Sequence, residues 1–435
     1  LTDSVNNYST QIVLYDQITD SELNITNNKV ENSFLSFMGN TLLYSSNYDD
    51  NFNQLWSIDL TTNEQKKVYS APWDIVGANF YENTNTLHVF INEDASTKLV
   101  FLSAEDYSEL SNEILPSDGL KGFSLSRSED SYAFVFGSDT SPGDLYFSNT
   151  NFDESSLVAR SFETLDEVSM VSSEVIRFKS FDGLEIPSIL YKPQGASASN
   201  PAPVMVYVHG GPGGQTRKGF NSQIQYMLHH GYGILGVNNR GSSGYGAEFY
   251  HLDDKRHGQE DLQDIIASKE YLQSLPWVDD NKIGVMGGSY GGFMTLAALT
   301  FYPDVFNVGI DIFGVSNWVR TLKSIPPWWE SFKVALYDEM GDPATDEERH
   351  RKISPLFHAQ NITKPMLVIQ GSNDPRVLQI ESDEIVNQVR ANDVYVDYLV
   401  FPDEGHGFRK KINRVKSANS IVDFLDECLK KNICS

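Results

Sequence analysis

The pattern of apolar residues changes near residue 173, and this change limits the folds open to the chain. Residues 1–172 form short β-prone runs separated by turn residues, which is typical of antiparallel sheets. From residue 173 onward, buried-looking strands alternate with helices, as in a mostly parallel sheet covered by helices. We therefore predict two domains, an all-β region at residues 1–172 and an α/β domain at residues 173–435.

The β-prone runs of the first region repeat along the chain. Their starting points near Ser33, Val76 and Leu120 differ by 43 and 44 residues, and the four-stranded blades of β-propellers repeat at roughly that period. About three to four such units fit into the region, fewer than a closed propeller needs. Because the chain opens at Leu1 without an initiator Met, we expect an incomplete propeller with further blades upstream. A β-sandwich-like remnant is the alternative.

Acidic side chains are concentrated in the first region. The chain has a formal net charge of -26, and residues 1–172 hold 27 acidic against 7 basic side chains. Such a surface repels the phosphates of nucleic acids and of anionic lipids, so neither is an expected partner. In addition, no uninterrupted apolar stretch is long enough to span a bilayer.

The cysteine content says little about the fold or the cellular compartment. Cys428 and Cys434 are the two cysteines of the chain, and both lie within its last residues. Two cysteines exclude a disulfide scaffold, and their spacing is not that of a CxxC metal or redox site, so we interpret them as incidental thiols. The compartment, cytoplasmic or periplasmic, and the oligomeric state, including a homo-oligomer, stay open.

The strongest local signal is the sequence GGSYGG at residues 287–292. It fits the pattern G-x-S-x-G, follows a predicted strand at residues 282–286 and precedes a predicted helix at residues 293–299. In that context the motif forms a sharp turn that exposes Ser289 at the carboxyl end of the sheet. A glycine-rich turn can also bind phosphate, but no Lys-Ser/Thr pair follows this one. We therefore predict that Ser289 is a nucleophile.

A serine nucleophile needs a general base, and the expected chain order is Ser, then Asp or Glu, then His. His406 alone among the nine histidines follows the last predicted strand, and Asp374 follows the strand before it. We predict that His406 is the base and that Asp374 orients it. A plain Asn-Asp-Pro turn is the alternative for Asp374. Asp403 and Glu404 are rivals for its role, but they lie too close in sequence to His406.

Acyl transfer also requires hydrogen-bond donors for the oxyanion that forms on the substrate carbonyl. One expected donor is the backbone amide of Tyr290, the residue after the nucleophile. The other is expected from the sequence HGGPGG at residues 209–214, which follows the first predicted parallel strand. This turn matches the oxyanion loop of many α/β-hydrolases, and Gly211 is the predicted donor. An ordinary flexible loop is the alternative.

Jointly, these residues resemble the prolyl oligopeptidase family of serine peptidases, closest to its acylaminoacyl-peptidase-like branch. The separations of 85 residues from Ser289 to Asp374 and of 32 from Asp374 to His406 are similar to the family pattern. The matching stretches extend over nearly all of residues 175–435: SFDG at 180–183, HGGP at 209–212, NRGS at 239–242, GGSYGG at 287–292, GSNDPRV at 371–377 and EGHGF at 404–408.

The resemblance implies an α/β-hydrolase domain and a β-propeller that, in such enzymes, caps the active site and admits short peptides. It implies that Gly211 and Tyr290 supply the amide donors and that Arg376 holds a backbone carbonyl of the acyl portion. It also implies that Val315 and Trp318 line the pocket for the side chain before the scissile bond. No cofactor and no metal is implied.

Two departures from the family pattern bear on function. Leu378 and Gln379 stand where the family commonly has Pro, and the acidic pair with which aminopeptidase members bind a free amino terminus is not located in the first region. We therefore expect a peptidase that hydrolyses short peptides through an acyl-enzyme, with the exopeptidase type left open. The alternatives are a carboxylesterase with the same triad and an inactive propeller-based binding protein.

Overall fold

The computed structural model describes residues 2–6, 9–110, 119–149, 155–162 and 170–434 of the chain. The chain divides into two compact units. The first unit comprises Leu1–Val168 and two short segments from later in the sequence, Arg217–Phe220 and Ser243–Tyr250. The second unit comprises the rest of the chain.

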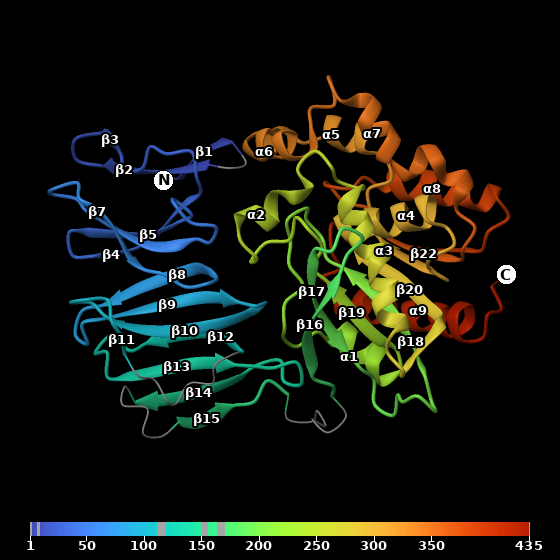
Figure 1. The fold of residues 1–435 in the computed structure, drawn as a ribbon, viewed down its shortest axis with the longest axis horizontal. Helices are drawn as coiled ribbons and strands as arrows, with labels where there is room; N and C mark the ends of the chain where they lie inside the picture. The colour runs from blue at the N-terminus through green and yellow to red at the C-terminus, as the bar shows by residue number, and fades with distance from the viewer. Residues whose placement is uncertain (1, 7–8, 111–118, 150–154, 163–169, 435) are drawn as a thin grey trace. The chain divides into compact units, whose positions relative to one another are not determined.

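The first unit is built from antiparallel sheets whose strands follow one another in the sequence (Figure 1). One sheet has three strands and three sheets have four, so the prediction of an all-β, propeller-like region is confirmed. The strands are β1 (Thr2–Asn6), β2 (Ser9–Asp16), β3 (Ser21–Asn24), β4 (Asn32–Met38), β5 (Thr41–Ser46), β6 (Gln54–Asp59), β7 (Gln65–Tyr69), β8 (Asp74–Tyr81), β9 (Thr86–Glu93), β10 (Ser96–Ser103), β11 (Glu109–Leu110), β12 (Leu120–Leu125), β13 (Ser131–Phe136), β14 (Asp144–Asn149) and β15 (Ser155–Ala159).

The core of this unit lies between successive sheets. Leu43 and Leu55, from β5 and β6, are fully buried in one apolar cluster with Ile75, Leu87 and Val89 from β8 and β9. Each of these strands directs alternate side chains to opposite faces, so a four-stranded sheet can pack against the sheet before it and the sheet after it. The three four-stranded sheets begin with β4, β8 and β12, close to the starting points of the sequence repeat.

The two short segments are held in the first unit by hydrogen bonds to its strands and loops. The guanidinium of Arg217 donates to Asn92 Oδ1 at 2.6 Å. The backbone amide of Ala247 donates to the carbonyl of Asn51 at 2.7 Å. Ala247 begins the short helix α2 (Ala247–Tyr250). The chain therefore leaves the second unit twice to complete the first.

The second unit is an eight-stranded sheet in the order β16-β17-β19-β18-β20-β21-β22-β23. Antiparallel pairing joins β16, β17 and β19, and the pairs from β19 to β23 are parallel. This topology confirms the predicted α/β-hydrolase sheet. Its strands are β16 (Ser173–Lys179), β17 (Glu185–Tyr191), β18 (Ala202–Val208), β19 (Gly233–Val237), β20 (Val278–Gly288), β21 (Gly309–Ile312), β22 (Met366–Gly371) and β23 (Val396–Phe401).

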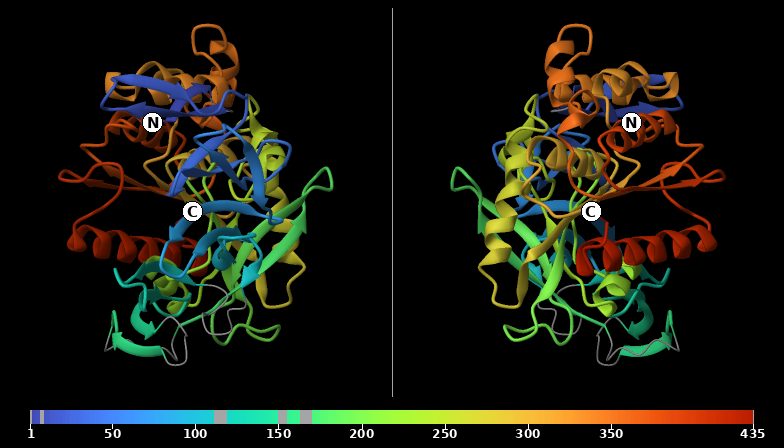
Figure 2. Two further views of the ribbon diagram at one scale, coloured as in Figure 1. Left: turned by 90° about the vertical axis from the view of Figure 1, so that its left-hand side faces the viewer. Right: turned by 90° about the vertical axis from the view of Figure 1, so that its right-hand side faces the viewer.

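Helices cover both faces of this sheet, which buries the central strands β19, β21 and β22 along their whole length. Figure 2 shows α8 and α9 on opposite sides of β22 and β23. The α-helices of the unit are α1 (Ser222–His229), α3 (Glu260–Gln273), α4 (Tyr290–Phe301), α5 (Trp318–Lys323), α6 (Glu330–Met340), α7 (Glu347–Ile353), α8 (Gln379–Ala391) and α9 (Lys411–Leu425). No helix among these described residues is long and apolar enough to cross a membrane.

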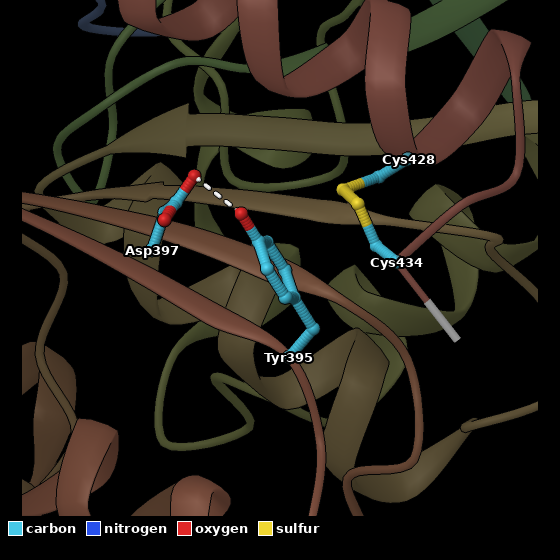
Figure 3. Close-up of a disulfide and its surroundings, with 4 residues drawn as sticks. All are labelled: Tyr395, Asp397, Cys428 and Cys434. Atoms are coloured by element: carbon cyan, nitrogen blue, oxygen red, sulfur yellow. Dashed lines mark hydrogen bonds between the residues drawn. A yellow bond between two sulfur atoms is a disulfide. The ribbon is translucent and has the colours of Figure 1, made fainter.

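The interpretation of Cys428 and Cys434 as incidental thiols is wrong, because the structure joins them in a disulfide (Figure 3). The chain turns after α9, where the amide of Ile433 donates to the carbonyl of Glu427 at 3.1 Å. This turn brings the two Cα atoms to 4.9 Å from each other, within the usual range for a bridge. Both cysteines are buried, so the bridge closes the carboxyl-terminal turn against the end of α9.

Removal of this bridge should lower stability without loss of turnover. The loop that it closes spans only six residues, and for so short a loop the chain-entropy model gives about 2 kcal/mol. We expect Cys428→Ala/Cys434→Ala to melt at a lower temperature than the wild type, and dithiothreitol to lower the melting temperature of the wild type alone. A reductant effect of equal size on the double variant would assign the change to another cause.

Candidate active site

Ser289 lies at a sharp turn between β20 and α4. Its backbone has φ 58° and ψ -117°, a left-handed conformation that a non-glycine residue rarely adopts and that stores strain. The turn is possible because its glycines let the strand and the helix approach closely. A Cβ at Gly287 or at Gly291 would collide with the backbone carbonyl of Val208 on the neighbouring strand β18. The serine hydroxyl thus projects from the carboxyl edge of the sheet, as the motif predicted.

The structure brings the three predicted triad residues together. His406 Nε2 lies 3.0 Å from Ser289 Oγ, and His406 Nδ1 lies 2.7 Å from Asp374 Oδ2. A carboxylate can only accept, so Nδ1 carries the proton and Nε2 is left to accept the serine proton. Asp374 follows β22 and His406 follows β23, and parallel pairing places the carboxyl ends of these strands side by side.

The carboxylate of Asp374 is fixed from the side away from the imidazole. Its Oδ1 accepts hydrogen bonds from the backbone amides of Arg376 at 2.8 Å and Val377 at 2.9 Å. The side chain is buried, so little water competes for these bonds. The two rival carboxylates have other partners. Asp403 pairs with Lys410, and Glu404 accepts from backbone amides that follow His406.

The predicted amide donors flank the nucleophile. Gly210 packs so closely that a Cβ there would lie 3.2 Å from the Gly288 carbonyl and 3.5 Å from Ser289 Cβ. Gly211 has φ +155°, and a Cβ on it would lie 2.7 Å from the amide nitrogen of Gly213, so glycine is required. Tyr290 begins α4, and the first amides of a helix have no acceptor within it. The Tyr290 amide is therefore available to an oxyanion, and the Gly211 amide stays a predicted donor.

Two of the three predicted substrate-binding residues are buried. Val315 and Trp318 are each 3% exposed. The indole of Trp318 packs against the ring of Tyr290 with centroids 6.1 Å apart and against Phe293 at 5.2 Å. Trp318 thus belongs to an aromatic cluster with Tyr290 and Phe293, next to the nucleophile turn, and its part in a substrate pocket stays a prediction.

Arg376 is exposed on the loop that follows Asp374. Its guanidinium lies 4.7 Å from the centroid of the Trp329 ring, a cation–π contact. Among the residues that the structure describes, no ion pair is recorded for Arg376 within 4.0 Å. Its charged donors are therefore not committed to a carboxylate of the chain.

The sequence reasoning missed a buried group of titratable residues behind Tyr290, which we call the His257 cluster: His257, Asp253, Glu339 and Asp261. His257 is fully buried, and its Nε2 lies 3.3 Å from Asp253 Oδ2 and 3.4 Å from Glu339 Oε1. The signal available in the sequence was Asp261, an acid that stands among the buried residues of α3 next to Leu262. A buried acid in such a position requires a partner.

The chain resembles known proteins in sequence and in fold. Residues 218–432 match the model of the family described as "Prolyl oligopeptidase family". The chain is 38% identical over 274 residues to dipeptidyl aminopeptidase BIII of Pseudoxanthomonas mexicana, covering 61% of this chain and 40% of that protein. It is 30% identical over 393 residues to dipeptidyl peptidase family member 6 of Caenorhabditis elegans, covering 84% of this chain and 53% of that protein. The chain thus spans about half the length of the curated relatives it matches.

Solved structures show the same architecture. Pyrococcus horikoshii acylaminoacyl peptidase superposes with a TM-score of 0.77 at 26% identity, covering 97% of this chain and 66% of that chain. A puromycin-hydrolyzing peptidase of Mycobacterium tuberculosis superposes with a TM-score of 0.84 at 22% identity, covering 97% and 65%. The family match shows that residues 218–432 belong to the prolyl oligopeptidase family, and the solved structures show that the chain shares the fold of its members.

Proposed function

We propose that this protein is a serine peptidase that hydrolyses short peptides through an acyl-enzyme. In this proposal the catalytic domain comprises residues 173–435 and the propeller-like region residues 1–172. The observation that carries the proposal is the hydrogen-bond chain from Ser289 Oγ through His406 to Asp374, with contacts of 3.0 and 2.7 Å, set on a strained strand–helix turn. Membership of the prolyl oligopeptidase family supports the same chemistry.

The geometry suggests how the reaction proceeds. Ser289 Oγ attacks the scissile carbonyl while His406 Nε2 takes its proton, and the Asp374 carboxylate stabilises the imidazolium that forms. The oxyanion accepts hydrogen bonds from the amides of Gly211 and Tyr290. His406 then returns the proton to the leaving amine, and a water attacks the acyl-enzyme by the same steps in reverse.

A carboxylesterase is the second candidate, because the same residues cleave activated esters. The names of the relatives favour a peptidase: they include dipeptidyl peptidases and the acylamino-acid-releasing enzyme of Arabidopsis thaliana. These names differ in whether the substrate's amino end is free or acylated. A panel of chromogenic peptides in matched free and N-acetylated forms separates the two types. Turnover of simple esters with no turnover of any peptide would remove the peptidase proposal.

Arg376→Ala should impair peptide hydrolysis far more than ester hydrolysis. In the proposed role the guanidinium binds a backbone carbonyl of the acyl portion, a charge-assisted bond whose loss costs roughly 1.5–3 kcal/mol. We expect kcat/KM for a peptide to fall about 10- to 100-fold, while that for p-nitrophenyl acetate, which lacks this carbonyl, stays near the wild-type value.

The cation–π contact with Trp329 supplies a matched control for this prediction. Trp329→Leu removes the ring under the guanidinium and leaves the charge in place, so the peptide should be affected less than in Arg376→Ala. If Arg376→Ala loses the same factor on both substrates, together with melting temperature, the side chain is structural and has no part in substrate binding.

A further inference from the structure

The His257 cluster contacts Tyr290 and also the turn that holds the Gly211 loop. The catalytic steps above do not use its buried residues. We propose that the His257 cluster is the positioning element of the oxyanion hole: it holds Tyr290 from behind and supports the turn that anchors the Gly211 loop. The inference rests on the proposed function, since it assigns a role in the reaction at Ser289.

The cluster is assembled from three elements of the second unit. Asp253 comes from a short 3-10 turn, His251–Asp253, while Asp261 lies in the first turn of α3 and Glu339 near the end of α6. His257 and Asp261 are 0% exposed, Asp253 is 2% and Glu339 is 7% exposed. One imidazole thus faces several carboxyl groups without access to bulk water. Burial of these groups costs free energy unless their charges are paired.

The first link to catalysis runs through the side chain of Tyr290. Its phenol donates a hydrogen bond to Asp261 Oδ2, and its ring stands edge-on to the His257 imidazole, with centroids 5.7 Å apart and an interplanar angle of 87°. Burial raises the pKa of the Tyr290 phenol well above its usual value, so the hydroxyl keeps its proton and remains a donor. These contacts fix the side chain of the residue whose backbone amide is the proposed donor.

The second link runs through the turn at Gly241. Its φ is +89°, and a Cβ there would overlap the Asp253 carboxylate, so the turn packs directly on the cluster. The next residue, Ser242, places its Oγ 2.8 Å from Nε2 of His209, the residue at the start of the Gly210–Gly211 loop. A shift of Asp253 therefore displaces the turn on which the second donor loop is anchored.

The charges of the cluster depend on one proton. Burial by itself lowers the pKa of His257, but Asp253 and Glu339 outweigh it and raise that pKa to about 9. Burial also raises the pKa of Asp253, to about 8. His257 and Asp253 therefore hold a proton between them at neutral pH, and its loss at higher pH makes the cluster more negative. Two further charged residues lie around the cluster: Asp254 beside Asp253, and Arg349 in α7 near Tyr290.

The direction of the pH effect follows from these shifts. Both groups bind their protons more tightly in the folded protein than in the unfolded chain, where the ordinary values are 6.5 for His and 3.8 for Asp. The stability that Asp253 contributes is therefore fully present below pH 3.8 and is lost as pH rises through about 8, and the contribution of His257 is fully present below pH 6.5 and is lost through about 9. Above that pH uncompensated carboxylates repel one another behind Tyr290, and kcat should fall while KM stays nearly constant.

The test uses His257→Gln and Tyr290→Phe in the full chain, with a p-nitrophenyl ester and its thionoester analogue as probes. A thionoester forms a weaker hydrogen bond in the oxyanion hole, so the ratio of oxygen-ester to thionoester rates reports on donor placement. We expect each variant to lower kcat for the oxygen ester roughly tenfold, with little change in KM and a smaller ratio. The loss of kcat above about pH 9 should disappear in His257→Gln.

A matched control is His358→Gln, because the His358 ring contacts Phe301 at the far end of α4, with centroids 5.4 Å apart and an interplanar angle of 58°. It should keep the wild-type ratio. If His257→Gln does not fold, Tyr290→Phe decides alone, since it removes one hydroxyl and keeps the ring. The inference would be overturned if both variants kept the wild-type ratio of oxygen-ester to thionoester rates. It would also be overturned if both esters lost the same factor in rate and this loss paralleled a fall in melting temperature. A wild type that hydrolyses neither ester contradicts the proposed function itself.

Discussion

Ser289→Ala is expected to lose about a million-fold in kcat for peptides and for esters alike, since triad members act as a unit. The side chain projects from the turn and, within the described part of the chain, forms one hydrogen bond, to His406, so its loss removes the nucleophile with little change in packing. His406→Ala should lose a comparable factor. The double variant should be no slower than either single one, because each already disables the same step. Single-turnover rates and melting temperatures of all three variants measure this.

Ser274→Ala is the control for Ser289→Ala. Ser274 caps the end of α3, is exposed and donates to the carbonyl of Tyr271. It should retain full turnover. Normal turnover in Ser289→Ala would contradict the mechanism, and a large fall in its melting temperature would show that the lost activity reflects unfolding rather than a missing nucleophile.

Asp374→Asn is expected to lower kcat by about ten-thousand-fold while leaving the fold intact. An amide at this position can donate toward His406 Nδ1, which favours the imidazole tautomer with its proton on Nε2. That tautomer cannot accept the proton of Ser289. The backbone amides of Arg376 and Val377, which now bond to Oδ1, can still bond to the amide oxygen. Chromogenic peptide turnover measured across pH, with circular dichroism of both proteins, tests the result.

Asp403→Asn is the matched control, since Asp403 lies three residues before His406 and carries the same charge. Its carboxylate pairs with Lys410 on the surface, and exposed pairs contribute little. Turnover should change less than twofold. A loss in Asp403→Asn similar to that in Asp374→Asn would reopen the assignment of the orienting acid.

Sequence pattern was sufficient for the features that depend on neighbouring residues. The strand, the glycine turn and the helix around Ser289 are contiguous, so one stretch of sequence was enough to predict both the motif and its structural context. Asp374 and His406 were predicted from the chain order Ser, Asp, His and from the strands that they follow, and the parallel pairing of β22 with β23 places the ends of these strands side by side. Their catalytic roles stay predictions until the variants above are measured.

Features that depend on tertiary packing could not be predicted from the sequence. His257 stands in a polar stretch of sequence, and only the fold surrounds it with Asp253 and Glu339, the latter 82 residues further along the chain. The disulfide was missed because two cysteines six residues apart reveal nothing of the turn that brings them together. Helices α5, α6 and α7, between β21 and β22, were missed because they are short and carry no clear apolar stripe.

The path of the chain between the two compact units bears on how such proteins can diversify. Residues 217–220 and 243–250 belong to the first unit but are encoded within the second, so the backbone passes between the units at five points rather than one. A gene fusion that exchanged residues 1–168 for another propeller would replace the residues that these two segments contact, such as Asn92 and Asn51. An exchange at one linker is therefore insufficient, because residues 217–220 and 243–250 would have to be exchanged with residues 1–168.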